Sequence, residues 1–303
     1  MSRPSSPTRR ATLAAAGALI VAACSSAPDE TAVVTSVIST STAAVLQTTT
    51  VGASSSTTVA TTTTVDPRSG NEPPDWLGTR DLPLRPGEDN GVAQPTPPEL
   101  VDRRLWTVDV LQPPATEAFV SQTWNPPPTD VLARSTFRDD CPIGVDDIAY
   151  ARVSFYGFDG LFHTGEFIAR TEHVEQLVDI FASLHGMRFP IEEMAVTTQE
   201  ALDAHPTGDS NNTSSFVCRP AVNSGSWSRH ALGGAIDLNP FHNPYVKGDL
   251  VIPELASAYL DRENHRVGMV TPEVVALFAE IGWGWGGDWN SASDWMHFSD
   301  TGN

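Results

Sequence analysis

Residues 228–237 read Ser-Arg-His-Ala-Leu-Gly-Gly-Ala-Ile-Asp, and residues 294–297 read Asp-Trp-Met-His. The two stretches supply His230, Asp237 and His297 as candidate metal ligands, with the carboxylate of Asp294 close by in sequence. A hydrolytic zinc site needs three such protein ligands, an open position for water and a nearby base. No two of the three cysteines lie close enough in sequence to suggest a thiolate site instead. The sequence therefore predicts a zinc site.

The spacings predict how these residues are presented. His230 and Asp237 are separated by a Gly-Gly pair, which argues against one continuous helix and favours a turn that leads into a strand. Asp294 and His297 are three residues apart, so in a flat strand they would point to opposite faces. At least one of them must lie in a turn if both face the same metal. An isolated histidine is more often structural, but these stretches in this order form a specific pattern.

A wider segment, residues 212–245, reads NTSSFVCRPAVNSGSWSRHALGGAIDLNPFHNPY. It resembles the zinc D-Ala-D-Ala carboxypeptidases of bacterial cell walls, whose motif is S-x-H-x-x-G-x-A-x-D. The later D-W-M-H resembles the second motif of that family, in which many members have Glu as the acidic residue. Here the acidic residue is Asp294, and in this respect the chain resembles the branch of the family that includes endolysin peptidases cutting between L-Ala and D-Glu. The resemblance covers roughly residues 136–303.

The resemblance implies a fold, an activity and residue roles. It implies the zinc DD-peptidase (Hedgehog-like) fold and a zinc peptidase that hydrolyses peptidoglycan stem peptides, as a D-Ala-D-Ala carboxypeptidase or an L-Ala-D-Glu endopeptidase. Asp294 would be the general base and then the acid, and Arg219 would stabilise the developing oxyanion. Ser228 and Asp288 are candidates for substrate contact or for support of the ligands, although an ordinary turn role fits both equally well. A surface ion pair is the alternative for Arg219.

The first 24 residues predict a bacterial lipoprotein signal peptide. Three arginines precede an apolar run over residues 11–23, which is too short to span a membrane. The run ends in Val-Ala-Ala-Cys, which is similar to a lipobox with Cys24 as the lipidated residue. The alternative is an ordinary cleaved signal with an incidental cysteine. Arg9-Arg10 resembles a twin-arginine signal too weakly to identify the export route.

If Cys24 carries lipid, Cys141 and Cys218 remain as a pair. Outside the membrane a disulfide is permitted, and closing this long loop would stabilise the fold by about 2–4 kcal/mol. Because Cys218 precedes Arg219, such a bridge would also tether the entrance to the site. Two free buried thiols are the alternative.

Between the signal peptide and the predicted catalytic domain lie two segments of unusual composition. Residues 31–65 contain 19 Ser or Thr and no charge, so residues 25–70 predict a flexible stalk. Residues 67–128 contain 13 of the 24 prolines, so residues 71–135 predict an extended lead-in, with a short element over residues 100–111 and packing along the catalytic domain.

Residues 136–303 are long enough for a single core and predict an α+β domain with a small antiparallel sheet flanked by helices. Strands are expected over residues 148–155 and 166–169. One helix is expected from an N-cap at Thr171 to residue 185, and a second from Thr271-Pro272 to Gly282. Trp283-Gly284-Trp285 is expected to form a strand and turn along the cleft. We expect the other six histidines to be structural or at the surface.

The net charge of −19 argues against nucleic acid and against charge-driven adhesion to anionic lipid. The charge does not identify a substrate. The predicted lipid anchor, flexible stalk and hydrolytic site together lead us to expect a monomer at the outer face of the bacterial cell membrane, with a peptidoglycan peptide as substrate and membrane contact only through the anchor. Two other classes remain open. One is a non-catalytic cell-wall binder, against which the intact Asp294 and Arg219 argue. The other is a structural zinc domain, which would normally need a fourth protein ligand, and His242 is close enough in sequence to test.

Overall fold

The computed structural model describes residues 68–222 and 224–302. The predicted signal peptide, Cys24 and nearly all of the predicted stalk lie outside these residues. The described part of the chain lies within one compact unit that begins at residue 63. Within it, no helix is long and apolar enough to cross a membrane.

A long antiparallel hairpin is the centre of the first sheet. Its strands, β2 (Ile148–Gly157) and β3 (Phe162–Arg170), pair from Ile148 opposite Arg170 to Tyr156 opposite Phe162. Both strands are longer than the sequence predicted, because the turn between them is confined to residues 158–161. Two short strands flank β2, with β1 (Ser121–Trp124) antiparallel to it and β4 (Pro190–Ile191) parallel to it.

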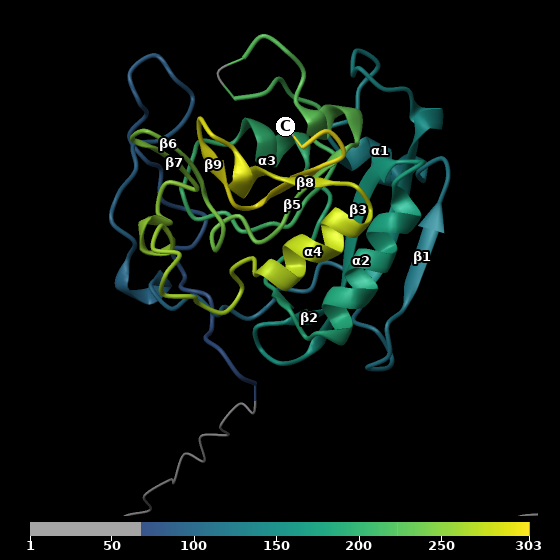
Figure 1. Ribbon diagram of the computed structural model, residues 1–303, viewed down its shortest axis with the longest axis horizontal. Helices are drawn as coiled ribbons and strands as arrows, with labels where there is room; N and C mark the ends of the chain where they lie inside the picture. The colour runs from purple at the N-terminus through teal and green to yellow at the C-terminus, as the bar shows by residue number, and fades with distance from the viewer. Residues whose placement is uncertain (1–67, 223, 303) are drawn as a thin grey trace, which may run out of the picture. The chain divides into compact units, whose positions relative to one another are not determined.

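Helix α2 (Val174–Gly186) packs on this sheet (Figure 1). Its apolar face is the predicted one, because Val174, Leu177, Val178 and Phe181 are buried. The predicted N-cap at Thr171 is wrong. Residues 171–173 form a turn, the cap position falls on His173, and no side chain caps the helix.

Helix α4 (Pro272–Glu280) begins as predicted, with the Thr271 side chain accepting a hydrogen bond from the backbone N–H of Val274. Its Phe278 ring stacks on Phe298 with a centroid distance of 3.8 Å. Together with α2 and the first sheet it encloses the main core, in which Trp283 is also buried. The core thus lies directly behind the strand that contains His297.

Two further three-stranded sheets contain Asp237, Asp294 and His297. In one, β10 (His297–Ser299) lies between β5 (Ala235–Asp237) and β8 (Gly284–Trp285). In the other, β6 (Tyr245–Lys247) lies between β7 (Leu250–Ile252) and β9 (Ser293–Asp294). All of these pairings are antiparallel. The α+β class is therefore confirmed, with three small sheets rather than one, and β4 is the parallel exception.

Residues 71–135 pack against the rest of the compact unit, as the sequence suggested. Leu82, Leu100 and Leu105 form a second core cluster with residues of the 241–269 region. Arg103 is fully buried and pairs with Glu192, with its Nη2 donating at 2.6 Å to one carboxylate oxygen and its Nε at 2.8 Å to the other. Within the predicted 100–111 element, only residue 100 is helical. The regular elements not yet named are η1 (Pro98–Leu100), α1 (Thr129–Arg134), η2 (Val145–Asp147), α3 (Gln199–Asp203), η3 (Arg229–Leu232), η4 (Ser257–Tyr259) and η5 (Gly286–Asp288).

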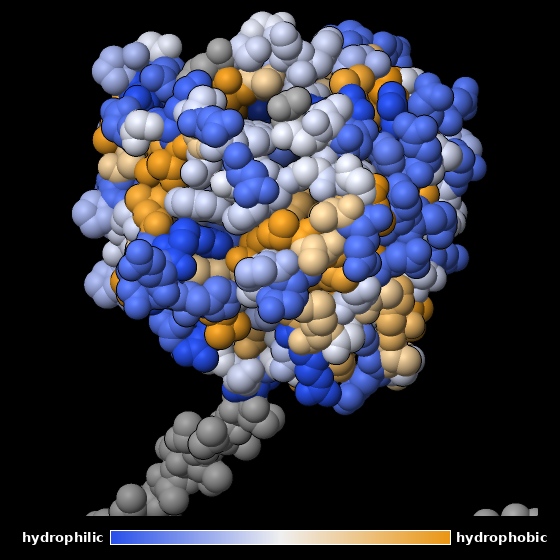
Figure 2. Space-filling model, in the orientation of Figure 1, coloured by the Kyte–Doolittle hydropathy of each residue, from blue (hydrophilic) through white to orange (hydrophobic). Residues whose placement is uncertain are grey.

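The predicted disulfide is confirmed. Cys141 and Cys218 are bonded across 77 positions of sequence. Cys218 also lies in a third core cluster with residues of α1, β2 and β3, so the bridge joins the segment before Arg219 to the loop of Cys141 beside the first sheet. Hydrophilic residues predominate on the face of the molecule in Figure 2, and hydrophobic residues form separate groups on it.

Candidate metal centre

The turn that presents His230 depends on the predicted Gly-Gly pair. Ser228 caps the short helix η3, and its hydroxyl accepts a hydrogen bond from the backbone N–H of His230 at 3.3 Å. Gly233 ends the helix in a left-handed conformation with φ = 65°, where a Cβ atom would lie 2.6 Å from the backbone nitrogen of Arg170. Only glycine fits this position without displacing strand β3. The chain then enters β5, as predicted.

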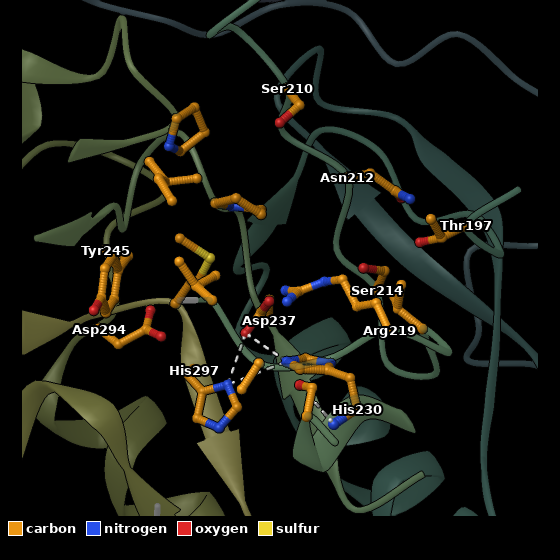
Figure 3. Close-up of a pocket in the computed structure, with 18 of the residues that line it drawn as sticks. Thr197, Ser210, Asn212, Ser214, Arg219, His230, Asp237, Tyr245, Asp294 and His297 are labelled. Carbon is orange, nitrogen blue, oxygen red and sulfur yellow. Dashed lines mark hydrogen bonds and ion pairs between the residues drawn. The ribbon is translucent and has the colours of Figure 1, made fainter. Parts of the chain in front are cut away.

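The pairing of β10 with β5 brings the second motif to the first. His297 lies opposite Asp237 in this antiparallel register. Asp294 ends β9, residues 295–296 form a turn, and His297 begins β10. The predicted turn between Asp294 and His297 is thus present, and it lets both side chains face one cavity (Figure 3).

Three donor atoms form a nearly equilateral triangle. The Nε2 atom of His230 lies 3.2 Å from Nδ1 of His297 and 3.3 Å from Oδ1 of Asp237. The third side, from His297 Nδ1 to Asp237 Oδ1, is 3.0 Å. Ligands at about 2.0–2.2 Å from a tetrahedral zinc ion are separated from one another by roughly 3.3–3.6 Å. The donor types and spacing therefore fit zinc, and they form the one such cluster of His, Cys, Asp and Glu among the described residues.

Hydrogen bonding and charge orient these ligands. The Nδ1 of His230 donates to the backbone carbonyl of Ser215 at 2.5 Å, which leaves Nε2 with its lone pair toward the cluster. Burial alone would raise the pKa of Asp237, but His230 and His297 hold it well below its usual range. The Asp237 side chain is therefore a carboxylate ready to bind a cation.

No fourth protein ligand joins the triangle among the described residues. The proposed alternative ligand His242 is fully buried elsewhere, where its Nε2 donates to the backbone carbonyl of Arg103 at 2.9 Å and its Nδ1 faces Asn211. A metal held by the three donors would keep an open position toward the cavity. This arrangement is typical of a catalytic rather than a structural zinc site.

Asp294 lies beside the cluster. In Figure 3 its carboxylate points toward Asp237 and His297, and its buried Oδ1 has no hydrogen-bond partner among the described residues. Burial raises the pKa of Asp294 to about 7, the charge of Asp237 adds to the shift, and the charges of His297 and Arg219 oppose it. A carboxyl group with a pKa near neutrality can both take up and release a proton at physiological pH.

Arg219 faces Asp294 across the cluster in the same view, from the segment that precedes η3. One of its guanidinium nitrogens, Nη1, donates to the backbone carbonyl of Pro220 at 3.1 Å. No carboxylate of the described residues lies within ion-pair distance of it. The surface ion pair considered as an alternative is therefore absent from the described part of the chain, and the guanidinium is available to a ligand.

These residues line a cavity of about 480 Å³. Ser228 lines it as well, so both of its predicted roles remain compatible with the structure. Asp288 is exposed at the end of η5 and is not part of the lining, so the structure does not bring it to the site. The predicted wall of Trp283 and Trp285 is also absent from the lining, because Trp283 is buried in the core. Trp289 takes that place, with its ring 5.4 Å from that of His297.

The sequence analysis missed several residues that shape the site. Tyr245 lines the cavity because β6 places it opposite Asp294, and Ser214 lines it because it bridges to Asp237. Asp300 was also missed, although it follows His297 by three residues. It accepts hydrogen bonds from Arg229 and, at 2.9 Å, from Nε2 of His173. No residue pattern marked these positions, because their partners are remote in sequence.

Comparison with known proteins gave a match to one protein family. Residues 222–300 match a protein family described as D-alanyl-D-alanine carboxypeptidase. The matched segment contains all three donors of the triangle and Asp294, and it begins after Arg219. Neither the curated proteins nor the solved structures gave a match.

Proposed function

Because residues 222–300 match the D-alanyl-D-alanine carboxypeptidase family, we propose that this chain is a zinc-dependent peptidase that hydrolyses the stem peptides of peptidoglycan. The observation that carries the proposal is the triangle of His230 Nε2, Asp237 Oδ1 and His297 Nδ1, with its open side in the cavity. The full zinc DD-peptidase (Hedgehog-like) fold for residues 136–303 is part of the proposal.

The three ligands would hold zinc. Zinc would lower the pKa of a water molecule, so that the water could lose a proton and attack a peptide carbonyl at neutral pH. Asp294 would take one proton from that water and pass it to the leaving amine. The water oxygen would join the carbonyl carbon and the C–N bond would break. The second proton of the water would also pass to the leaving nitrogen, so the products would be a carboxylate and an ammonium group. Arg219 would donate hydrogen bonds to the negative charge that develops on the carbonyl oxygen.

A family of cell-wall peptidases indicates an extracytoplasmic location, and the disulfide agrees with an oxidising compartment. We further propose that Cys24 carries a lipid anchor at the outer face of the bacterial cell membrane and that residues 25–70 act as a stalk. The chain would act as a monomer and would reach the cell wall from this anchor.

The proposed function is tested by digesting purified peptidoglycan with the protein after loading with zinc and after chelation. Mass spectrometry of the products should show shortened stem peptides only with the zinc-loaded protein. Metal analysis should find about one zinc ion per chain, and His230→Ala should lose it. His205→Ala is the matched control, because His205 is exposed and is not a member of the cluster. Intact stem peptides after digestion with zinc-loaded protein would contradict the proposal.

A further inference from the structure

A second hollow of about 600 Å³ adjoins the cavity of the metal centre. Leu202 and Arg219 line both, so the two hollows meet at these side chains. The second hollow extends from there to helix α3 and to residues 133–138, which include the end of α1 and the segment after it. We propose that the two hollows form one substrate cleft and that the enzyme cuts an interior bond of the stem peptide. This inference rests on the proposed peptidase function.

The placement of Asp294 and Arg219 gives the cleft a direction. The two side chains lie on opposite sides of Asp237 in Figure 3. Asp294 would deliver the proton to the leaving amine, so the part of the peptide that follows the cut bond lies on its side. Arg219 would contact the carbonyl oxygen, so the acyl part of the peptide lies on the side of Arg219. The second hollow therefore receives the residues that precede the cut bond.

The charges around the cavity oppose a free C-terminal carboxylate next to the cut bond. On the side of Asp294 in Figure 3, the lining includes Tyr245 and Asp294 itself, and strand pairing places Ile252 beside Tyr245. Arg219 and Arg229 are the cations among the described lining residues, and Arg229 is bound to Asp300. A buried anion without a partner is strongly disfavoured. A peptide that continues past the cut bond places a neutral amide there instead.

Polar side chains line the second hollow. Gln199 and Asp203 lie one turn apart on α3, and the Gln199 amide donates to Asp203 at 2.9 Å. Elsewhere in the lining, Arg138 Nη1 donates to the carbonyl of Cys218 at 3.0 Å, and Cys218 is bonded to Cys141. An extended peptide chain would find hydrogen-bond donors and acceptors among these side chains.

The first experiment compares a stem pentapeptide that has a free C-terminal carboxylate with the same peptide as its C-terminal amide. The zinc-loaded protein should cut the same interior bond in both, with kcat/KM values that agree within about threefold. Release of only the last residue, and only from the free acid, would overturn the inference while leaving the peptidase function intact. Cleavage of neither peptide would overturn it, and intact peptidoglycan in the digestion described above would then show whether the peptidase function also fails.

The second experiment tests the acyl side of the cleft. A muramoyl group on the pentapeptide extends the substrate toward the second hollow whichever interior bond is cut. Wild-type protein should show a higher kcat/KM for the muramoyl pentapeptide than for the free pentapeptide. The variant Gln199→Ala/Asp203→Ala should lower this ratio roughly five- to tenfold, because hydrogen bonds to the extension are lost.

Glu200→Gln is the matched control for α3, because Glu200 is exposed on the same helix and lines neither hollow. It should keep the wild-type ratio. Circular dichroism of both variants checks that α3 remains folded. An equal ratio in the wild type and the double variant would overturn the assignment of the second hollow as part of the cleft.

Discussion

Arg229 and Asp300 form a two-bond ion pair, in which Nε and Nη2 of the arginine each donate to one carboxylate oxygen. Arg229 precedes the ligand His230 by one residue, and Asp300 directly follows the strand that contains His297. The backbone N–H of Asp300 also donates to the carbonyl of Gly234 at 3.0 Å. This pair therefore joins the two chain segments that supply the histidine ligands.

We predict that Asp300→Asn weakens zinc binding by roughly ten- to a hundredfold, because residues that orient metal ligands commonly contribute this much. Asparagine keeps the shape of the side chain but removes the charge that Arg229 and His173 contact. Competition with a chromogenic chelator measures the affinity. Asp179→Asn, on the exposed face of α2, is the control. Equal zinc affinity in Asp300→Asn and wild type would show that the pair does not position the ligands.

Asp294→Asn should bind zinc normally and lose hydrolysis by about 100- to 10,000-fold, the usual contribution of a general base. The amide keeps the size of the side chain but cannot accept the proton. Zinc content and peptide hydrolysis should be measured on the same preparation. Asp288→Asn is the control, because Asp288 is exposed and outside the cavity lining. Loss of zinc from Asp294→Asn would make Asp294 a ligand, and full activity would place the base elsewhere.

The pH dependence of hydrolysis follows from the same carboxyl group. Asp294 must be deprotonated to act as a base, so kcat/KM should rise with pH through its pKa. Burial raises that pKa to about 7 in the protein without metal, and a nearby cation favours the charged form. The acidic limb of the profile should therefore lie below about pH 7 in the zinc-loaded enzyme. If the residual activity of Asp294→Asn shows the same acidic limb, that limb arises from the titration of another group.

The disulfide prediction concerns both stability and the site. Free-thiol titration of the unfolded protein without residues 1–70 should find no thiol. Cys141→Ser/Cys218→Ser should lower the free energy of unfolding by about 2–4 kcal/mol, because the bridge restricts the unfolded chain. Denaturant titration measures this loss, and serine at both positions avoids a free thiol. Two reactive thiols in the wild-type protein would contradict the bridge.

Membrane attachment should depend on Cys24. Cys24→Ser should leave the membrane fraction, since residues 31–65 of the proposed stalk have neither charge nor a second apolar span. One acyl chain binds a membrane only marginally, so a stable anchor needs a diacylglycerol. Cell fractionation followed by immunodetection tests this, with Ser25→Ala as the control. Membrane retention of Cys24→Ser would identify the apolar run of residues 11–23 as the anchor.

Residue types and their spacing were enough to predict the three candidate ligands, because these are local features of the sequence. Two histidines and Asp237 can bind zinc in any fold that brings them together, and Gly233 indicates a turn between His230 and Asp237. Helix α4 was predicted for a similar reason, since Thr271 and Pro272 act on the backbone of their own first turn. The predicted N-cap at Thr171 was wrong because residues 171–173 form a turn before the helix begins. Tertiary packing determines where that turn ends.

The remote residues that complete the site could not be predicted from local patterns, because tertiary packing brings them there. Strand register placed Tyr245 opposite Asp294 and His297 opposite Asp237, and it brought Asp300 to Arg229 across 71 positions. The same packing left Asp288 at the surface and enclosed Asp294, whose raised pKa comes from burial and from the charge of Asp237. Burial and long-range pairing depend on how the whole chain folds, so no local pattern encodes them.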